Sequence, residues 1–532
     1  ISAGSVGAYT VDAEGNIYYY TQDWNSDTGY NTGGGVLCKI SPDGESLYTL
    51  KLDEQVAGFR RTDSLAADGK GNVYLLAMGK ILKIDKEGNL AGEVVTDENH
   101  SHQVILGREY LLETAEGDIY YVKYDNECEV WQCMGEGDLK LVKGPILEGR
   151  GISRVYRGME GILVADRQEV LYRYRDGMAE ALLCWQESNI MGSNVMEVVP
   201  ISEDTILALE RKNLYLLKKT PVSELPQKEI VVLASLFPDN SLRQAVINFN
   251  LSNDNYFVKI ESYGVNPFQE GDNTPEGAAL RLDNAVSSSS ECPDLLDLAD
   301  LDVHKYAGKK ALEDLSSYME EDGFRREDFL ENALKGYTIN GRLVCIPKFF
   351  TFSTVVGRAN QAGEGSGWTA EDYFKLLADY PGNIGAVLYY GQSDGETLIK
   401  NFFHYYYLNE YVDWEKGKCS FDSQEFYNLA EQIFNHNGDG RGRNDLMGIL
   451  PQDVMFKVDE IGNFVGYFSL VSAFEGDISL VGYPNTEGYP LHKANVRDCI
   501  GILSHSGNKE GAWEFIKYYL NMDEGEFISY FP

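Results

Sequence analysis

The stretch Glu229-Ile230-Val231-Val232-Leu233-Ala234-Ser235 decides the fold of the second half of this chain. It is a short, almost continuous apolar run, which is typical of a strand buried on both faces in a parallel sheet. Asp239-Asn240-Ser241 then offers helix N-caps, and apolar residues recur at helical spacing up to Asn250. Polar and apolar residues alternate over 256–263, which predicts a second strand. This order of strand, helix and strand predicts an α/β domain that begins near residue 229.

The sequence before this point is a degenerate repeat. Each copy places a turn of Gly and small polar residues before strand-forming residues, and the copies are Asp12–Tyr18, Asp68–Tyr74, Ala115–Tyr120, Met159–Leu163 and Ser202–Leu207. The glycines at 15, 71, 117 and 161 are 56, 46 and 44 residues apart. A period in the forties with several short strands per unit is typical of β-propeller blades. We therefore expect an N-terminal all-β propeller of about five blades, with a β-sandwich as the alternative.

Composition excludes several classes of function. The chain has 532 residues, too many for one core, so we expect two or three domains. Its formal net charge of −37 would repel phosphate backbones and anionic lipids, which argues against binding to nucleic acid or to a membrane surface. Such acidity fits a secreted or surface-exposed protein. The 35 tyrosines suit carbohydrate or peptide surfaces, although strand faces account for most of them.

The cysteines and the ends of the chain give weaker indications. Eight cysteines are scattered without metal-ligand spacing, so we expect free buried thiols rather than a disulfide framework. No apolar run is long enough to span a membrane. The chain opens at Ile1 without methionine, so we expect that a targeting segment has been removed. It stops at Pro532, and we expect the second domain to be truncated there.

The second half contains further elements in strand and helix alternation. A third strand is predicted over 293–299, and amphipathic helices over 276–289, 310–321 and 325–334. A tight Asn340-Gly341 turn then joins two strands in a hairpin that leads into a crossing strand over 351–358.

Four segments of this half carry a resemblance to a known family: Tyr337–Phe350, Gly367–Tyr373, Tyr411–Ser423 and Gly501–Ile516. They resemble segments of the extracellular solute-binding proteins of ABC importers, particularly the sugar-binding family. In chain order, the four segments resemble the family's crossover between lobes, the start of the helix that opens the second lobe, a turn segment with Gly-Lys, and the return helix. The resemblance covers residues 228–530, and its last match is the strongest. The predicted organisation is a repeat domain over 1–222, a linker over 223–228 and a solute-binding domain over 229–532.

The resemblance implies a two-lobed α/β fold of the periplasmic-binding-protein type, which closes on its ligand about a hinge. Open sheets of this kind bind ligands at the carboxyl ends of their strands. Applied to this chain, that rule selects strand ends that carry aromatic rings for sugar C–H faces and polar groups for sugar hydroxyls. The predicted ligand-binding residues are Phe237, Asp239, Asp300, Asp302, Phe349, Phe350, Tyr389, Tyr390, Gln392, Phe474, Glu475 and Tyr483.

The function that follows is substrate capture rather than catalysis. No G-x-S-x-G, P-loop or H-E-x-x-H motif occurs, so we expect no catalytic residues, no metal and no cofactor. We expect a monomer, lipid-anchored on the outer face of the bacterial membrane, that passes an oligosaccharide to the permease of an ABC importer. A peptide is the second candidate ligand. The alternatives are a glycan-processing enzyme, or a sensing or adhesion protein that works through the repeat domain.

Overall fold

The computed structural model describes residues 5–522 except for several segments, the longest of which are 53–61, 97–108, 360–366, 376–387, 390–410 and 436–455. The chain divides into two compact units, one of residues 1–294 with 510–532 and one of residues 295–509. The predicted boundary between residues 222 and 229 therefore stays a prediction, because the first unit contains residues from both sides of it. Within the described residues, no helix has the length and apolar character needed to cross a membrane.

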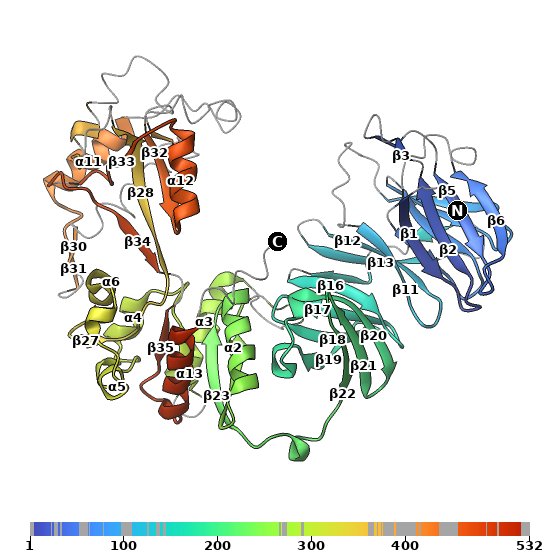
Figure 1. Cartoon of the computed structure of the whole chain (residues 1–532), viewed down its shortest axis with the longest axis horizontal. Helices are drawn as coiled ribbons and strands as arrows, with labels where there is room; N and C mark the ends of the chain where they lie inside the picture. Colours follow the sequence, from blue (N-terminus) through green and yellow to red (C-terminus); the bar gives the residue numbers. More distant parts are fainter. Residues whose placement is uncertain are drawn as a thin grey trace. The chain divides into compact units, whose positions relative to one another are not determined.

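Five antiparallel sheets make up the repeat region, coloured blue to green in Figure 1. The first sheet contains β1 (Ser5–Val11), β2 (Ile17–Gln22), β5 (Val36–Ile40) and β6 (Ser46–Lys51), and the second contains β7 (Ser64–Ala67), β8 (Val73–Ala77), β9 (Lys80–Ile84) and β10 (Leu90–Val95). The third contains β11 (Glu109–Glu113), β12 (Ile119–Tyr124), β13 (Cys128–Met134), β14 (Lys140–Leu141) and β15 (Leu147–Gly149). The fourth contains β16 (Ile152–Arg157), β17 (Ile162–Asp166), β18 (Val170–Arg175) and β19 (Met178–Cys184), and the fifth contains β20 (Val195–Ser202), β21 (Thr205–Glu210) and β22 (Leu214–Lys218). A small hairpin of β3 (Trp24–Asn25) and β4 (Tyr30–Asn31) lies between β2 and β5 in the sequence.

Apolar clusters join these sheets in chain order. One cluster packs Tyr18 of the first sheet with Leu75 of the second, and another packs Tyr74 of the second with Tyr121 of the third. Two more clusters join the third sheet to the fourth and the fourth to the fifth. The predicted succession of short-stranded units is thus confirmed. The described strands form no closed barrel, and the propeller stays a prediction.

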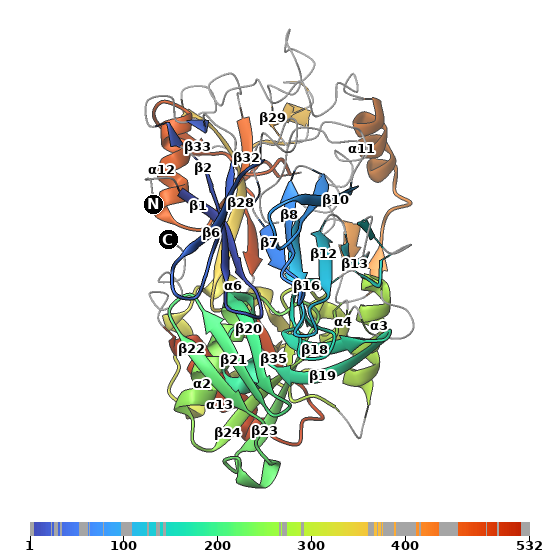
Figure 2. The same cartoon turned by 90° about the vertical axis from the view of Figure 1, so that its right-hand side faces the viewer.

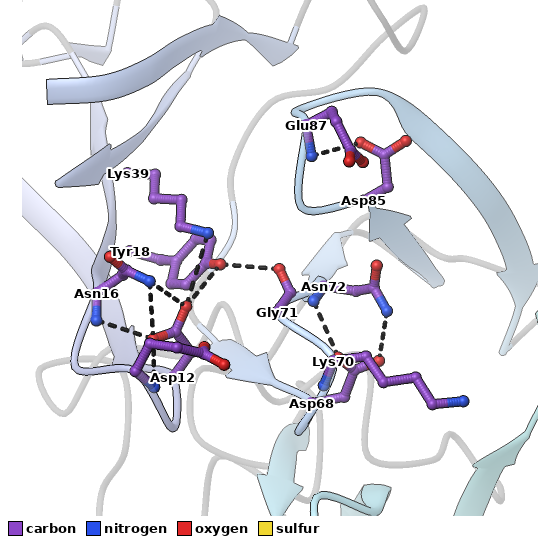
Figure 3. A network of polar contacts seen from close by, with 11 residues as sticks. Asp12, Asn16, Tyr18, Lys39, Asp68, Lys70, Gly71, Asn72, Asp85 and Glu87 are labelled. Carbon is purple, nitrogen blue, oxygen red and sulfur yellow. Dashed lines mark hydrogen bonds and ion pairs between the residues drawn. The ribbon is translucent and has the colours of Figure 1, made fainter. Parts of the chain in front are cut away.

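The repeated turn is held by an aspartate (Figure 3). In the second sheet, Asp68 Oδ1 accepts hydrogen bonds from the backbone N–H groups of Lys70 and Asn72, both at 2.9 Å. Its Oδ2 accepts from Asn72 Nδ2 at 2.7 Å and from the Tyr74 hydroxyl at 3.2 Å. Gly71 follows with a φ of 80°, a left-handed conformation that favours glycine. Asp12, Asp85 and Asp166 accept the corresponding backbone bonds in three other turns.

This turn gives a first prediction. Asp68 is 8% exposed, so Asp68→Ala should leave the buried Tyr74 hydroxyl and the half-buried Asn72 without their acceptor and lower the free energy of unfolding by about 2 kcal/mol. Asp85→Ala in the exposed β9–β10 turn should cost less, because water can replace the lost acceptor. Urea unfolding of the two variants measures the difference. Equal losses would contradict a buried structural role for Asp68.

The α/β part of the first unit begins where the sequence predicts it. Strands β23 (Glu229–Ser235) and β24 (Tyr256–Ser262) pair in parallel, and α2 (Asn240–Ser252) connects them. Helices α3 (Pro275–Ser287) and α13 (Lys509–Asn521) complete this part. Helices α2 and α13 lie side by side in both views (Figure 1 and Figure 2), and the rings of Phe249 and Phe515 meet there edge to face at 5.3 Å.

The fourth sheet packs directly on this α/β part. Gln186, which follows β19, donates from Nε2 to the carbonyl oxygen of Val258 at 3.2 Å and accepts from Ile260 N–H at 3.3 Å. The side chain of Gln186 therefore makes two hydrogen bonds to the backbone of β24, as a neighbouring strand would. Lys259 and Glu187 add an ion pair at 3.0 Å. The repeat region and the first α/β strands thus share one packed interface within this unit.

The second unit contains the remaining α/β elements. Strands β25 (Leu295–Asp297) and β35 (Ile500–Ile502) pair antiparallel, and the predicted Asn340-Gly341 hairpin forms between β26 (Thr338–Ile339) and β27 (Arg342–Leu343). Helices α4 (Val303–Gly308), α5 (Ser316–Glu321) and α6 (Glu331–Gly336) lie between these strands in the chain. The helix predicted from residue 310 forms only from Ser316, because Lys310 has a positive φ of 56° and Leu312 forms a β-bridge with Leu503.

A second sheet of this unit is built on β28 (Phe350–Arg358), its long central strand in Figure 1. The strands around it are β29 (Leu388–Tyr389), β32 (Phe456–Ile461), β33 (Ile478–Leu480) and β34 (Lys493–Val496). Helix α12 (Phe464–Ala473) covers one face through Leu470, which packs with Val356 and Ile461. The other elements are the hairpin β30 (Val412–Asp413) and β31 (Lys418–Cys419), and helix α11 (Gln424–Asn435).

One disulfide joins Cys345 to Cys499 within the second unit, with their Cα atoms 6.0 Å apart. Cys345 lies on the segment that enters β28, and Cys499 on the segment that leaves β34 for β35. The expected free thiols are found at the other six cysteines, and this pair is the exception. The two paired residues are 154 positions apart, so only the fold brings them together.

Candidate functional site

The first candidate region is the end of β23, in the first unit. The loop after this strand runs from Leu236 to Asp239, and the ring of Phe237 is 49% exposed. Asp239 caps α2, accepting a hydrogen bond at Oδ1 from Leu242 N–H at 2.8 Å. Both residues follow the carboxyl end of β23, where α/β sheets bind ligands, and their contact with a ligand stays a prediction.

A buried cation supports this loop. Arg243 on α2 is 4% exposed, and its Nε donates to the carbonyl oxygen of Pro238 at 3.1 Å. Burial lowers the pKa of Arg243, while the carboxylates of Glu169 and Asp166 in the repeat region oppose this shift. Burial in turn raises the pKa of both carboxyls, and the charge of Arg243 works against that rise. A buried charge thus bonds directly to the backbone of this loop.

The second candidate region is one face of the β28 sheet, in the second unit. The register pairs Thr351 with Asn495, and Ser353 with both Glu460 and Lys493. Directly paired residues of antiparallel strands share a face, as do residues two apart on one strand. Five polar side chains therefore lie together on the face opposite α12. We call them the polar cluster: Thr351, Ser353, Glu460, Lys493 and Asn495.

Hydrogen bonds organise the polar cluster. The Thr351 hydroxyl donates to Glu460 Oε1, and Asn495 Nδ2 donates to Ser353 Oγ at 2.7 Å. Partial burial lowers the pKa of Lys493, and the Glu460 carboxylate opposes this shift. The cluster combines hydroxyl, amide, carboxylate and ammonium groups, which together can donate to and accept from a polyhydroxylated ligand.

An aromatic ring borders the polar cluster. A Cβ atom placed on Gly462 would lie 2.8 Å from Thr351 Cγ2 and 3.9 Å from Cζ of Phe349. Gly462 therefore permits a close approach of the chain after β32 to the start of β28. Phe349 is half-buried beside this point, whereas Phe350 opens β28 on the opposite face.

The other predicted ligand-binding residues are found in different environments. Asp300 and Asp302 are exposed, and Asp302 caps α4. Glu475 is exposed with a φ of 57°. Phe474, the C-cap residue of α12, is 2% exposed and packs in the core with Leu470, and Tyr483 is 3% exposed, so both rings are buried in this structure. The side chains of Tyr389, Tyr390 and Gln392 lie outside the described residues.

Sequence reasoning missed the polar cluster. Its members come from three strands, and the hydrogen bonds within it join residues 109 and 142 positions apart. The alternation Thr351, Ser353 on the predicted crossing strand is the one local signal that could have indicated a polar face. Among the described residues, no group of three or more His, Cys, Asp or Glu side chains could hold a metal ion.

Comparisons with known proteins show the following. No family model and no curated protein matches the chain. Among solved structures, it is similar to an ABC substrate-binding protein of Listeria monocytogenes in complex with cycloalternan, with 16% identity, 56% of this chain and 76% of that chain covered, and a TM-score of 0.33. The sugar-binding protein MalE of Xanthomonas citri gives 14% identity, 55% and 75% coverage, and a TM-score of 0.38. A family 1 extracellular solute-binding protein of Bifidobacterium longum subsp. infantis gives 15% identity, 56% and 79% coverage, and a TM-score of 0.38.

Proposed function

We propose that this protein captures an oligosaccharide outside the cell and presents it to the permease of an ABC importer, closing its two lobes on the sugar. The observation that carries this proposal is the polar cluster beside Phe349 on the β28 sheet. Sugars are recognised by polar groups that bond their hydroxyls and by aromatic rings that cover their C–H faces, and this region supplies both. The four segments that resemble sugar-binding proteins of importers support the same function.

Two further observations support a location outside the cell. Disulfides such as Cys345–Cys499 persist in oxidising compartments and are rare in the reducing cytosol. The net charge of −37 favours solubility and disfavours binding to phosphate-rich partners.

The proposed role needs no covalent chemistry, because the free energy of sugar binding drives lobe closure. An affinity near 1 µM, or about 8 kcal/mol, would be ordinary for such capture.

A thermal-shift screen against maltotriose, cellotriose, xylotriose and short peptides tests this function. Ligand at about 100 times its Kd should stabilise the protein by about 2.7 kcal/mol and raise its melting temperature. A shift with one sugar, without product on prolonged incubation, is the expected result. Release of shortened sugars would instead identify an enzyme, and a shift with peptides alone would overturn the proposed ligand class.

The polar cluster gives a sharper prediction. Glu460→Gln should weaken binding of the selected sugar about tenfold, because it replaces a charged hydrogen-bond acceptor by a neutral one. Asp459→Asn is the matched control, since Asp459 is the neighbouring acid on β32 and its partner Thr354 lies on the opposite face of the sheet. Isothermal titration calorimetry measures both. Equal affinities for the two variants would exclude the polar cluster from the binding site.

A further inference from the structure

The turn between β17 and β18 lies against the end of the first α/β strands. This turn consists of Asp166, Arg167, Gln168 and Glu169, and belongs to the fourth sheet of the repeat region. Gln168 Nε2 donates to the carbonyl oxygen of Gly264, just beyond β24, at 2.7 Å. Both residues belong to the first unit. The repeat region therefore reaches the strand ends at which α/β sheets bind ligands.

Arg243 ties the same turn to the loop after β23. Its Nη2 donates to the carbonyl oxygen of Arg167 at 3.3 Å, while its Nε donates to that of Pro238 at 3.1 Å. One buried guanidinium thus bonds the repeat turn and the Phe237 loop at once. The loop and the end of β24 also meet, because a Cβ atom placed on Gly264 would lie 3.0 Å from the ring of Phe237.

The chain after β24 is bound to the fourth sheet as well. The Phe268 ring packs on Tyr172 with ring centres 4.6 Å apart and on Tyr174 at 6.0 Å. Asn266 Nδ2 donates to the Tyr172 hydroxyl at 3.3 Å. Side chains of β18 therefore hold Asn266 and Phe268, which follow β24 in the chain.

The turn differs from its counterparts in its fourth residue. Its fourth residue is Glu169 with a φ of 70°, at the position where the turns of the first and second sheets have Gly15, Gly71 and Gly88. Residues with a side chain are disfavoured in this conformation. The side chain of Glu169 nevertheless has a structural role, because its carboxylate accepts hydrogen bonds from the N–H groups of Gly192 and Ser193, the latter at 3.1 Å. The side chain of Arg167 is exposed on a backbone that is fixed from two sides.

We propose that the turn from Asp166 to Glu169 belongs to a sugar-binding surface of the first unit, with Arg167 contacting the bound sugar and Gln168 positioning the strand end beside it. Arg167, Phe237 and Asp239 then offer a guanidinium, an aromatic face and a carboxylate at one edge. The guanidinium carries five N–H donors suited to sugar hydroxyls. The repeat region is on this proposal a specificity element of the binding site. The inference rests on the proposed capture of an oligosaccharide.

Calorimetric titration of two matched variants tests this. Arg167→Ala should weaken binding of maltotriose, cellotriose or xylotriose, whichever the wild-type protein binds, about tenfold with an unchanged melting temperature, because Arg167 is exposed. Lys86→Ala is the control: Lys86 is also exposed and basic, and follows the aspartate of the corresponding β9–β10 turn. Its affinity should equal that of the wild type.

Gln168→Ala provides a second measurement. It should weaken binding of the same trisaccharide, and hydrogen exchange at Gly264 and its neighbours should become faster, because the Gly264 carbonyl oxygen loses its shorter hydrogen bond and keeps only the one from Arg281 Nη2 at 3.5 Å. If the wild type binds a trisaccharide and Arg167→Ala binds it as well as Lys86→Ala does, the role of the repeat region is overturned and sugar capture stands. If the wild type binds no trisaccharide, both proposals fail.

Discussion

Replacing Cys345 and Cys499 together by alanine is expected to lower the free energy of unfolding by about 5 kcal/mol, the largest single effect we predict for this protein. The two cysteines are 154 positions apart, so the disulfide closes a long loop. It removes conformational entropy from the unfolded chain, and the entropy removed grows with the length of the loop. Alanine is the appropriate replacement, because both cysteines are buried and a serine hydroxyl would add an unsatisfied polar group.

Differential scanning calorimetry under oxidising conditions measures this effect. The transition of the second unit should move to lower temperature, while a transition that belongs to the repeat region should not. Addition of a reductant should bring the wild type to the melting temperature of the variant and leave the variant unchanged. Cys419→Ala, which removes an exposed free thiol, is the control. A wild type insensitive to reductant would contradict a stabilising disulfide.

Arg243→Ala is expected to lower the free energy of unfolding by about 3 kcal/mol at neutral pH, because it leaves the buried carboxylates of Glu169 and Asp166 without their nearest buried cation. It also removes the donors to the carbonyl oxygens of Pro238 and Arg167. Chemical denaturation compares the variant with Arg211→Ala, which removes an exposed arginine from the β21–β22 turn and should be nearly neutral.

The loss should depend on pH. Burial raises the pKa of Glu169 and Asp166 in the folded protein, so the folded state takes up protons at higher pH than the unfolded state. As pH falls through the folded pKa, proton uptake stabilises the folded state, and the gain is complete below the unfolded pKa of about 4. Without Arg243 these pKa values rise further, so the variant should recover stability toward pH 5. A loss independent of pH would contradict the electrostatic explanation.

Local sequence was sufficient for much of the fold. The apolar run Glu229–Ser235 and the capping residue Asp239 determine β23 and the start of α2, because both depend on residues within one or two turns. The Asn340-Gly341 pair determines its hairpin, since both residues take the positive φ that a tight turn requires. The side-chain hydrogen bonds of the recurring turn aspartate likewise go to residues up to six positions ahead.

Only the tertiary structure decided the candidate sites. Phe474 is an expected ligand-wall aromatic in the sequence, yet at the end of α12 it packs in the core against Val356 of β28, because burial depends on which sheet the helix covers. The polar cluster joins Thr351 with Glu460, and the disulfide joins Cys345 with Cys499, over separations that no local pattern records. The hydrogen bond between Gln168 and Gly264 spans 96 positions and joins the repeat region to the α/β region. Sequence periodicity reports which face of an element is buried, whereas the partner of that face is chosen by packing of the whole chain.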